Sequence, residues 1–114
     1  MPRLHSRVRF VVEGANGPTT PDGDAALEDR GITIIPDVVA NVGGVICSYF
    51  EQVQSNTGRY WTREDVLSAL DERIARIVDD VTARANHEGV SLRDAAYRVA
   101  ISRVAEACSL RGWV

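Results

Sequence analysis

The sequence contains no lysine, and all thirteen of its basic residues are arginines. Because an arginine stays protonated at any working pH, it cannot carry protons in the way a buried lysine can. Every mechanism that needs a lysine from this chain is therefore excluded. Acidic residues outnumber basic ones by 16 to 13, which gives a formal net charge of -3. This balance gives no electrostatic reason to expect nucleic acid or an anionic membrane as a partner.

Long apolar runs and metal-binding patterns are also lacking. No apolar stretch approaches the roughly 20 residues that span a bilayer, and the start, MPRLHSRVRF, has charges but no apolar signal core. The sequence therefore predicts a cytoplasmic protein with no membrane partner. Cys47 and Cys108 lack CxxC spacing, so we expect reduced thiols. His5 and His87 are too isolated for a metal site, and we expect none.

The residues that are present predict one α/β domain. With 114 residues and 45% hydrophobic content, the chain fits a single packed domain. Residues 8–12 are an apolar stretch that ends at GANGP, as a buried strand would. Residues 22–30 contain helix formers with acids near the start, Gly31 follows as a C-cap, and residues 32–40 are a β-branched run broken by a proline. This order predicts a βαβ unit over residues 8–40, with two parallel strands and a short crossover helix.

Residues 41–114 are predicted to be helical. Apolar residues at intervals of three and four, from Val45 to Val53, form one face of a first helix. Thr62 with Asp65 is a capping-box pattern that opens a second helix, and SLRD opens a third in the same way. Three helices against two strands leave a small sheet with exposed edges. We therefore expect a homo-oligomer or a complementing chain that covers them.

Four separated blocks carry a resemblance to a known family: VVEGANGPTTPDGD, IPDVVANVGGVICSYFEQVQ, YWTREDV and RDAAYRVAISRVAEACSLRGWV. In order and spacing they resemble the C-terminal part of the glutamate dehydrogenase family, and GPTTPDGD resembles the glutamate branch of the amino-acid dehydrogenase superfamily. The resemblance covers almost the whole chain, from Val8 to Val114. It implies the second part of a Rossmann-like dinucleotide-binding domain followed by three C-terminal helices. Residues 1–114 would then form a single partial NAD(P)-binding domain with a C-terminal helical segment.

The resemblance implies oxidative deamination of glutamate to 2-oxoglutarate and ammonia with NAD or NADP, and it implies roles for single residues. Asn16 stands where the family's asparagine meets the nicotinamide-side ribose, and Asn41 where an asparagine holds the nicotinamide carboxamide. Ser48 resembles the serine that contacts the side-chain carboxylate of the substrate. Without the resemblance, these residues would be part of an ordinary turn, a helix N-cap and a helix-surface serine. The expected cofactor-binding residues are Gly14, Ala15, Asn16, Asn41, Gly43 and Gly44.

Other parts of the family's site have no counterpart in this chain. The substrate-binding and catalytic lysines, an acidic proton carrier and the Gly-rich phosphate turn are missing, and GxGxxG does not occur. We therefore expect no catalytic residue here and no deamination by the chain alone. Three interpretations stay open: an enzyme fragment, completed or not by a partner chain; a non-catalytic oligomerisation or cofactor-binding module; and a vestigial truncated chain. Met1 just before the first strand favours a truncated reading frame over proteolysis, and RGWV resembles the family's natural end.

Overall fold

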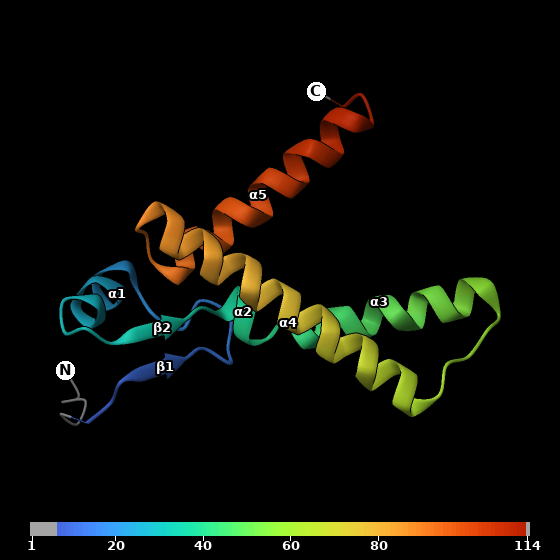
Figure 1. Cartoon of the computed structure of the whole chain (residues 1–114), viewed down its shortest axis with the longest axis horizontal. Coiled ribbons are helices and arrows are strands. Elements are labelled where there is room, and N and C mark those ends of the chain that lie inside the picture. The colour runs from blue at the N-terminus through green and yellow to red at the C-terminus, as the bar shows by residue number, and fades with distance from the viewer. Residues whose placement is uncertain (1–6, 114) are drawn as a thin grey trace.

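The chain folds as two parallel strands with five helices (Figure 1), and the computed structural model describes residues 7–113. In chain order the elements are β1 (Phe10–Val12), α1 (Pro21–Glu28), β2 (Thr33–Ile35), α2 (Asp37–Ala40), α3 (Val42–Thr57), α4 (Arg63–Glu88) and α5 (Leu92–Leu110). The strands pair in parallel with Val11 opposite Ile34. The predicted βαβ unit with three long helices after it is therefore confirmed.

The crossover helix α1 connects the two strands and covers one face of the sheet. Its N-terminus is capped by Thr20, whose Oγ1 accepts a hydrogen bond from Gly23 N at 3.2 Å. Leu27 packs with Ile32 and Ile34 in one of the two cores. The helix ends at Glu28, two residues before the predicted end at Arg30. Gly31 closes it as the expected C-terminal glycine: its φ is +68°, and the N–H groups of Gly31 and Ile32 donate to the carbonyl oxygens of Glu28 and Leu27.

The short helix α2 was not predicted from the sequence, where the region around it was a β-branched run. Pro36 is fully buried at its N-cap position with extended backbone, and the helix starts at the next residue. Asp37 stabilises the first turn, because its Oδ1 accepts a hydrogen bond from Val38 N at 2.8 Å. The chain therefore turns at the end of β2 and enters α3 directly.

The three long helices extend from the sheet in two directions (Figure 1). Helices α3 and α4 form an antiparallel hairpin, and the predicted capping box of Thr62 and Asp65 is present at the start of α4. The turn between α4 and α5 is closed by Gly89, with a φ of +64°. A second core joins the end of α4 to the start of α5 through Val81, Ala85, Ala95 and Ala96. Beyond this core, α5 projects away from the rest of the molecule.

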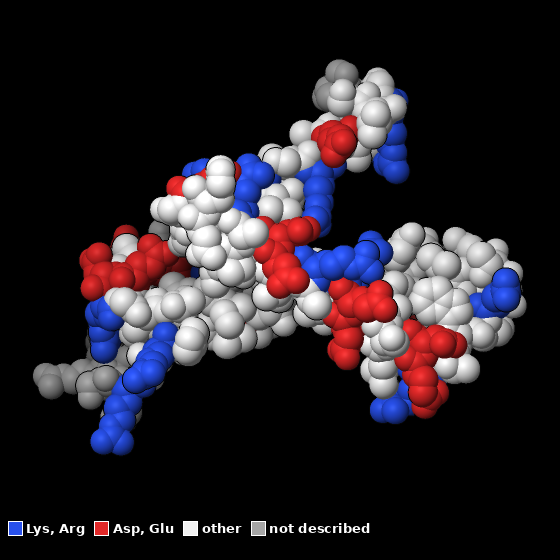
Figure 2. All heavy atoms as spheres, viewed as in Figure 1, with Lys and Arg blue, Asp and Glu red and all other residues white. Residues whose placement is uncertain are grey.

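Charged and apolar surfaces are both extensive. On the face drawn in Figure 2, acidic side chains gather over α1, and both signs alternate along α4 and α5. Large apolar side chains are exposed on β1 and along α5, where Phe10, Val12, Ile101 and Val104 are each more than 60% exposed. The described part of the chain, residues 7–113, has no helix long and apolar enough to cross a membrane.

Candidate functional site

The candidate site lies at the carboxyl ends of the two strands. After β1 the ladder continues for one residue, since Glu13 N donates to Ile35 O at 3.1 Å. The chain then leaves the sheet as an exposed loop of residues 14–17, while the chain after β2 enters α2. Ligands of open α/β sheets bind at this end of the strands.

A hydrogen bond between Asn16 and Asn41 joins the loop after β1 to the start of α3. Asn41 Nδ2 donates to Asn16 Oδ1 at 2.7 Å and to the Gly14 carbonyl oxygen at 3.3 Å. Both asparagines are solvent-exposed. Asn41 occupies the N-cap position of α3 as expected, but its side chain makes no capping hydrogen bond. The first N–H groups of α3 therefore lack a side-chain acceptor from this residue.

The remaining predicted site residues lie near this pair or farther along α3. Ala15 is exposed within the loop, and Gly43 and Gly44 form the first turn of α3. Ser48 is exposed on the same helix, seven residues after Asn41. Seven residues are nearly two turns of a helix, so Ser48 lies about 10 Å beyond Asn41 along the axis of α3. The structure thus brings the two asparagines together and places Ser48 about two turns farther along α3.

Two glycines of the site have no structural requirement within the described chain. A Cβ added at Gly14 or Gly44 would meet no atom of residues 7–113 within 4 Å, and neither residue has a positive φ. Gly17 is different, because its φ of +56° is a conformation that other residues adopt at a cost. The open space over Gly14 and Gly44 would let another molecule approach the backbone there.

A cluster of charged side chains lies next to the loop of residues 14–17. Arg93, in the first turn of α5, lies 2.7 Å from Glu13 Oε1 through its NH2 atom and 2.6 Å from Asp24 Oδ2 through Nε. Its NH1 atom is 3.6 Å from Asp37 Oδ1. Glu13 is 2% exposed and also accepts hydrogen bonds from Thr19 Oγ1 at 2.6 Å and Asp37 N at 3.0 Å. One guanidinium therefore links the ends of β1 and β2 to α1 and α5.

Electrostatics keeps Glu13 and Arg93 ionised. The hydrogen bond from Arg93 holds the pKa of Glu13 below its ordinary value, although burial acts in the opposite direction. The same hydrogen bond from the other side raises the pKa of Arg93 above its ordinary value, again against burial. Since both partners stay charged near neutral pH, the contacts to the loop persist there.

Sequence reasoning missed this cluster. In the sequence, Glu13 follows the first apolar run, Asp37 follows Pro36, and Arg93 lies in the SLRD block that opens the last helix, so nothing in these positions indicates a shared cluster. Eighty residues separate Glu13 from Arg93, so no local spacing connects them. The one available signal was a carboxylate directly after a buried apolar run, because such a charge requires a partner.

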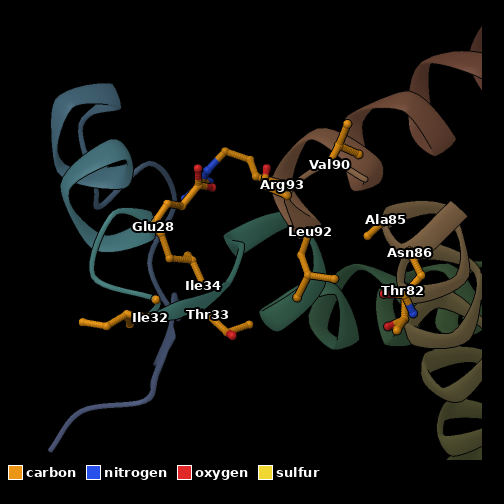
Figure 3. A pocket seen from close by; sticks show the side chains of 12 residues that line it. Glu28, Ile32, Thr33, Ile34, Thr82, Ala85, Asn86, Val90, Leu92 and Arg93 are labelled. Carbon is orange, nitrogen blue, oxygen red and sulfur yellow. The ribbon is translucent and has the colours of Figure 1, made fainter. Parts of the chain in front are cut away.

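The groove in Figure 3 lies beside this cluster, between β2, the end of α1 and the turn from α4 to α5. Ile32, Ile34 and Leu92 line it, and Arg93 extends from α5 toward α1. None of the predicted cofactor or substrate residues contributes to it. Within residues 7–113, no group of three or more His, Cys, Asp or Glu side chains could hold a metal ion. His5 lies outside the described residues.

Comparison with known proteins decides the family. The model of the Glutamate/Leucine/Phenylalanine/Valine dehydrogenase family matches residues 2–112. The chain belongs to this family. It is 44% identical over 108 residues to a cryptic catabolic NAD-specific glutamate dehydrogenase of Bacillus subtilis, and the match covers 95% of this chain and 25% of that relative. An NAD-specific glutamate dehydrogenase of Staphylococcus aureus is 45% identical over 107 residues, covering 94% of this chain and 26% of the relative.

Solved structures of the family share the fold. Glutamate dehydrogenase from Peptoniphilus asaccharolyticus has a TM-score of 0.85 and 43% identity, and the match covers 93% of this chain and 27% of that one. A hetero-hexameric glutamate dehydrogenase from Thermus thermophilus in its Leu-bound form has a TM-score of 0.87 and 37% identity, covering 92% and 25%. The chain thus spans about a quarter of the length of these relatives and matches their C-terminal portion. The resemblance and the fold class inferred from the sequence are confirmed.

Proposed function

We propose that this chain is the C-terminal segment of an NAD-dependent glutamate dehydrogenase and supplies the nicotinamide side of the cofactor site. The observation that carries the proposal is the Asn41–Asn16 hydrogen bond of 2.7 Å, which joins the loop after β1 to the start of α3. Gly14 and Gly44 flank this pair with open space above their backbone. The curated relatives at 44% and 45% identity are NAD-specific, which favours NAD over NADP.

The two asparagines have complementary groups left for a ligand. Their mutual hydrogen bond uses the donor of Asn41 and the acceptor of Asn16. Asn41 Oδ1 then remains as an acceptor and the two N–H groups of Asn16 Nδ2 remain as donors, which suits a carboxamide and a ribose hydroxyl. Bound NAD would accept hydride from the substrate, and the role of these side chains would be to fix which face of the nicotinamide meets it.

Ser48 would contribute to the substrate side of the site. It is exposed on α3, about two turns beyond Asn41. A hydroxyl at this position could donate a hydrogen bond to the side-chain carboxylate of glutamate. The lysines that the family uses for binding and catalysis would come from the part of the enzyme that this chain does not span, since the chain has none.

A chimeric enzyme tests the proposal directly. In it, this chain replaces the corresponding C-terminal quarter of the Bacillus subtilis relative, and glutamate-dependent reduction of NAD is measured. Asn41→Ala should lower kcat/KM for NAD by about two- to tenfold, the usual cost of a lost hydrogen bond. Asn56→Ala, an exposed asparagine near the end of α3, is the matched control and should have no effect. Equal kinetics for the two variants would refute the assignment.

Ser48 is tested in the same enzyme with a second pair of variants. Ser48→Ala should raise the KM for glutamate and leave the KM for NAD unchanged, because the serine would contact substrate and not cofactor. Ser55→Ala, exposed one heptad later on α3, is its control. A change in the KM for NAD alone would contradict the role proposed for Ser48.

The isolated chain should not deaminate glutamate, because it lacks the lysines and the phosphate turn. Glutamate-dependent NAD reduction by a pure preparation would contradict this.

An assembly role is the second candidate, and the exposed apolar side chains of β1 and α5 favour it. Under that reading the purified chain should form a homo-oligomer or bind a complementing chain. A solution mass equal to one chain of 12.5 kDa, with native helix content, would oppose the homo-oligomer.

A further inference from the structure

Arg93 is the single residue that contacts carboxylates from three separate elements within the described chain. Its guanidinium reaches Glu13 at the end of β1, Asp24 in α1 and Asp37 at the start of α2. About a fifth of its side chain is exposed, and Glu13 is almost fully buried. Three negative charges face one positive charge, so removing the guanidinium would leave these carboxylates to repel one another.

Two of these carboxylates hold the two ends of the loop. Glu13 directly precedes Gly14, and its Oε2 accepts the Asp37 N–H at 3.0 Å. Asp37 Oδ2 in turn accepts the Gly17 N–H at 2.8 Å. The loop of residues 14–17 is thus anchored at its start by Glu13 and at its end by Asp37. Arg93 forms an ion pair with each of these two anchors.

We propose that Arg93 is a positioning residue for the cofactor loop. Through Glu13 and Asp37 it fixes the conformation of residues 14–17, and through that loop it fixes the geometry of the Asn16–Asn41 pair. Its effect on the loop is a property of this chain alone. Its effect on NAD rests on the proposed function, because it acts only if the two asparagines contact the cofactor.

The effect on the loop is tested on the complete 114-residue chain by nuclear magnetic resonance. Arg93→Gln should move the amide signals of Gly17 and Asp37 and the side-chain signal of Asn41, and should speed exchange of the Asp37 amide by about tenfold or more. Amides in the middle of α3 and α4 should keep their positions. Arg93→Lys retains the charge without the fork that spans several carboxylates, so it should give the same pattern to a smaller extent.

The matched control is Arg98→Gln, which removes an arginine from the same helix that pairs with Glu88 on the surface. It should leave the Gly17 and Asp37 signals unchanged. If Arg93→Gln fails to fold, Arg93→Lys carries the test. Loop signals that stay in place in a folded Arg93 variant, or that move no more than in Arg98→Gln, would overturn the proposal.

The effect on NAD is tested by a double-mutant cycle in the chimeric enzyme. A residue that acts through the Asn16–Asn41 pair should matter little once Asn41 is gone. Arg93→Lys should therefore lower kcat/KM for NAD severalfold in the parent and much less in the Asn41→Ala background. A purely structural role would give equal fold-changes in both backgrounds and would overturn the proposal. If Asn41→Ala alone has no effect, the proposed cofactor site fails instead, and the resonance experiment still decides the role of Arg93 in the loop.

Discussion

Replacing Glu13 with glutamine should destabilise the fold by about 2–4 kcal/mol. The two carboxylate oxygens accept three hydrogen bonds, from Arg93 and Thr19 on Oε1 and from Asp37 N on Oε2. A glutamine has one acceptor oxygen, so its NH2 group must face either the guanidinium or the Asp37 N–H. Because the site is 2% exposed, water cannot replace the lost acceptor. Arg93 keeps its contacts with Asp24 and Asp37, which limits the loss.

Thermal and urea unfolding followed by circular dichroism at pH 7 would measure this cost. For a chain of this size, the loss corresponds to a fall in Tm of about 10 °C or more. Glu72→Gln is the matched control, because Glu72 pairs with Arg76 on the surface of α4 and its side chain is 66% exposed. That variant should stay within about 0.5 kcal/mol of the parent. If the two variants unfold with equal free energies, the buried carboxylate does not contribute as the structure indicates.

The stability difference between the parent and Glu13→Gln should depend on pH, in a direction set by the lowered pKa of Glu13. The pKa of Glu13 lies below its ordinary value of 4.5, chiefly because of the hydrogen bond from Arg93. A group whose pKa is lowered on folding stabilises the native state above its unfolded pKa, and this stability is lost as the pH falls through the native pKa. The difference between the parent and Glu13→Gln should thus be complete at pH 7 and decrease below about pH 4.5. A difference that does not change on acidification would contradict the charge-based explanation.

Three further substitutions separate backbone, cofactor and capping effects. Gly17→Ala should cost about 1–2 kcal/mol in urea unfolding, because its φ of +56° crowds a Cβ. Gly44→Ala should keep or slightly raise the stability of the fold, since its Cβ would meet no atom within 4 Å. The same variant should raise the KM for NAD in the chimeric enzyme, and an unchanged KM would count against close approach of the cofactor. Thr62→Ala should lower the free energy of unfolding by about 1 kcal/mol, because the capping box is lost. Ser68→Ala, at an exposed position within α4, is the control, and equal stability of the two variants would contradict the prediction.

The fold was predictable wherever the local pattern was long or had a recognisable cap. The helix from Arg63 to Glu88 repeats its apolar stripe over seven turns and begins with Thr62 and Asp65, so both its type and its start were evident. The helix α2 has four residues, which is too short to show a period. Two of its four residues, Val38 and Val39, are β-branched and follow a β-branched run, so propensity favoured a strand there. Tertiary contacts of Asp37, which the sequence does not display, override that preference.

The candidate site was predictable only in part, for a similar reason. Asn16 and Asn41 were identified through the resemblance, each within its own block of sequence. Their direct contact depends on parallel pairing of β1 with β2, which brings both strand ends to one edge of the sheet. The contact of Glu13 with Arg93 depends in addition on how α5 packs at the end of α4. That arrangement involves residues from opposite ends of the chain, so sequence periodicity cannot indicate it.

The glycines of the loop after β1 serve two different purposes, and this explains why so short a segment needs so many unusual residues. Gly17 is explained by the chain itself, because it has a positive φ, which favours glycine, and in this conformation its N–H donates to Asp37 Oδ2. Gly14 has no such requirement, since its backbone is ordinary and the space above it is open. A glycine that the protein's own packing does not explain is best explained by something that approaches from outside. The carboxylates of Glu13 and Asp37 contact the two ends of the loop, and the space around Gly14 stays open, as the proposed approach of a cofactor requires.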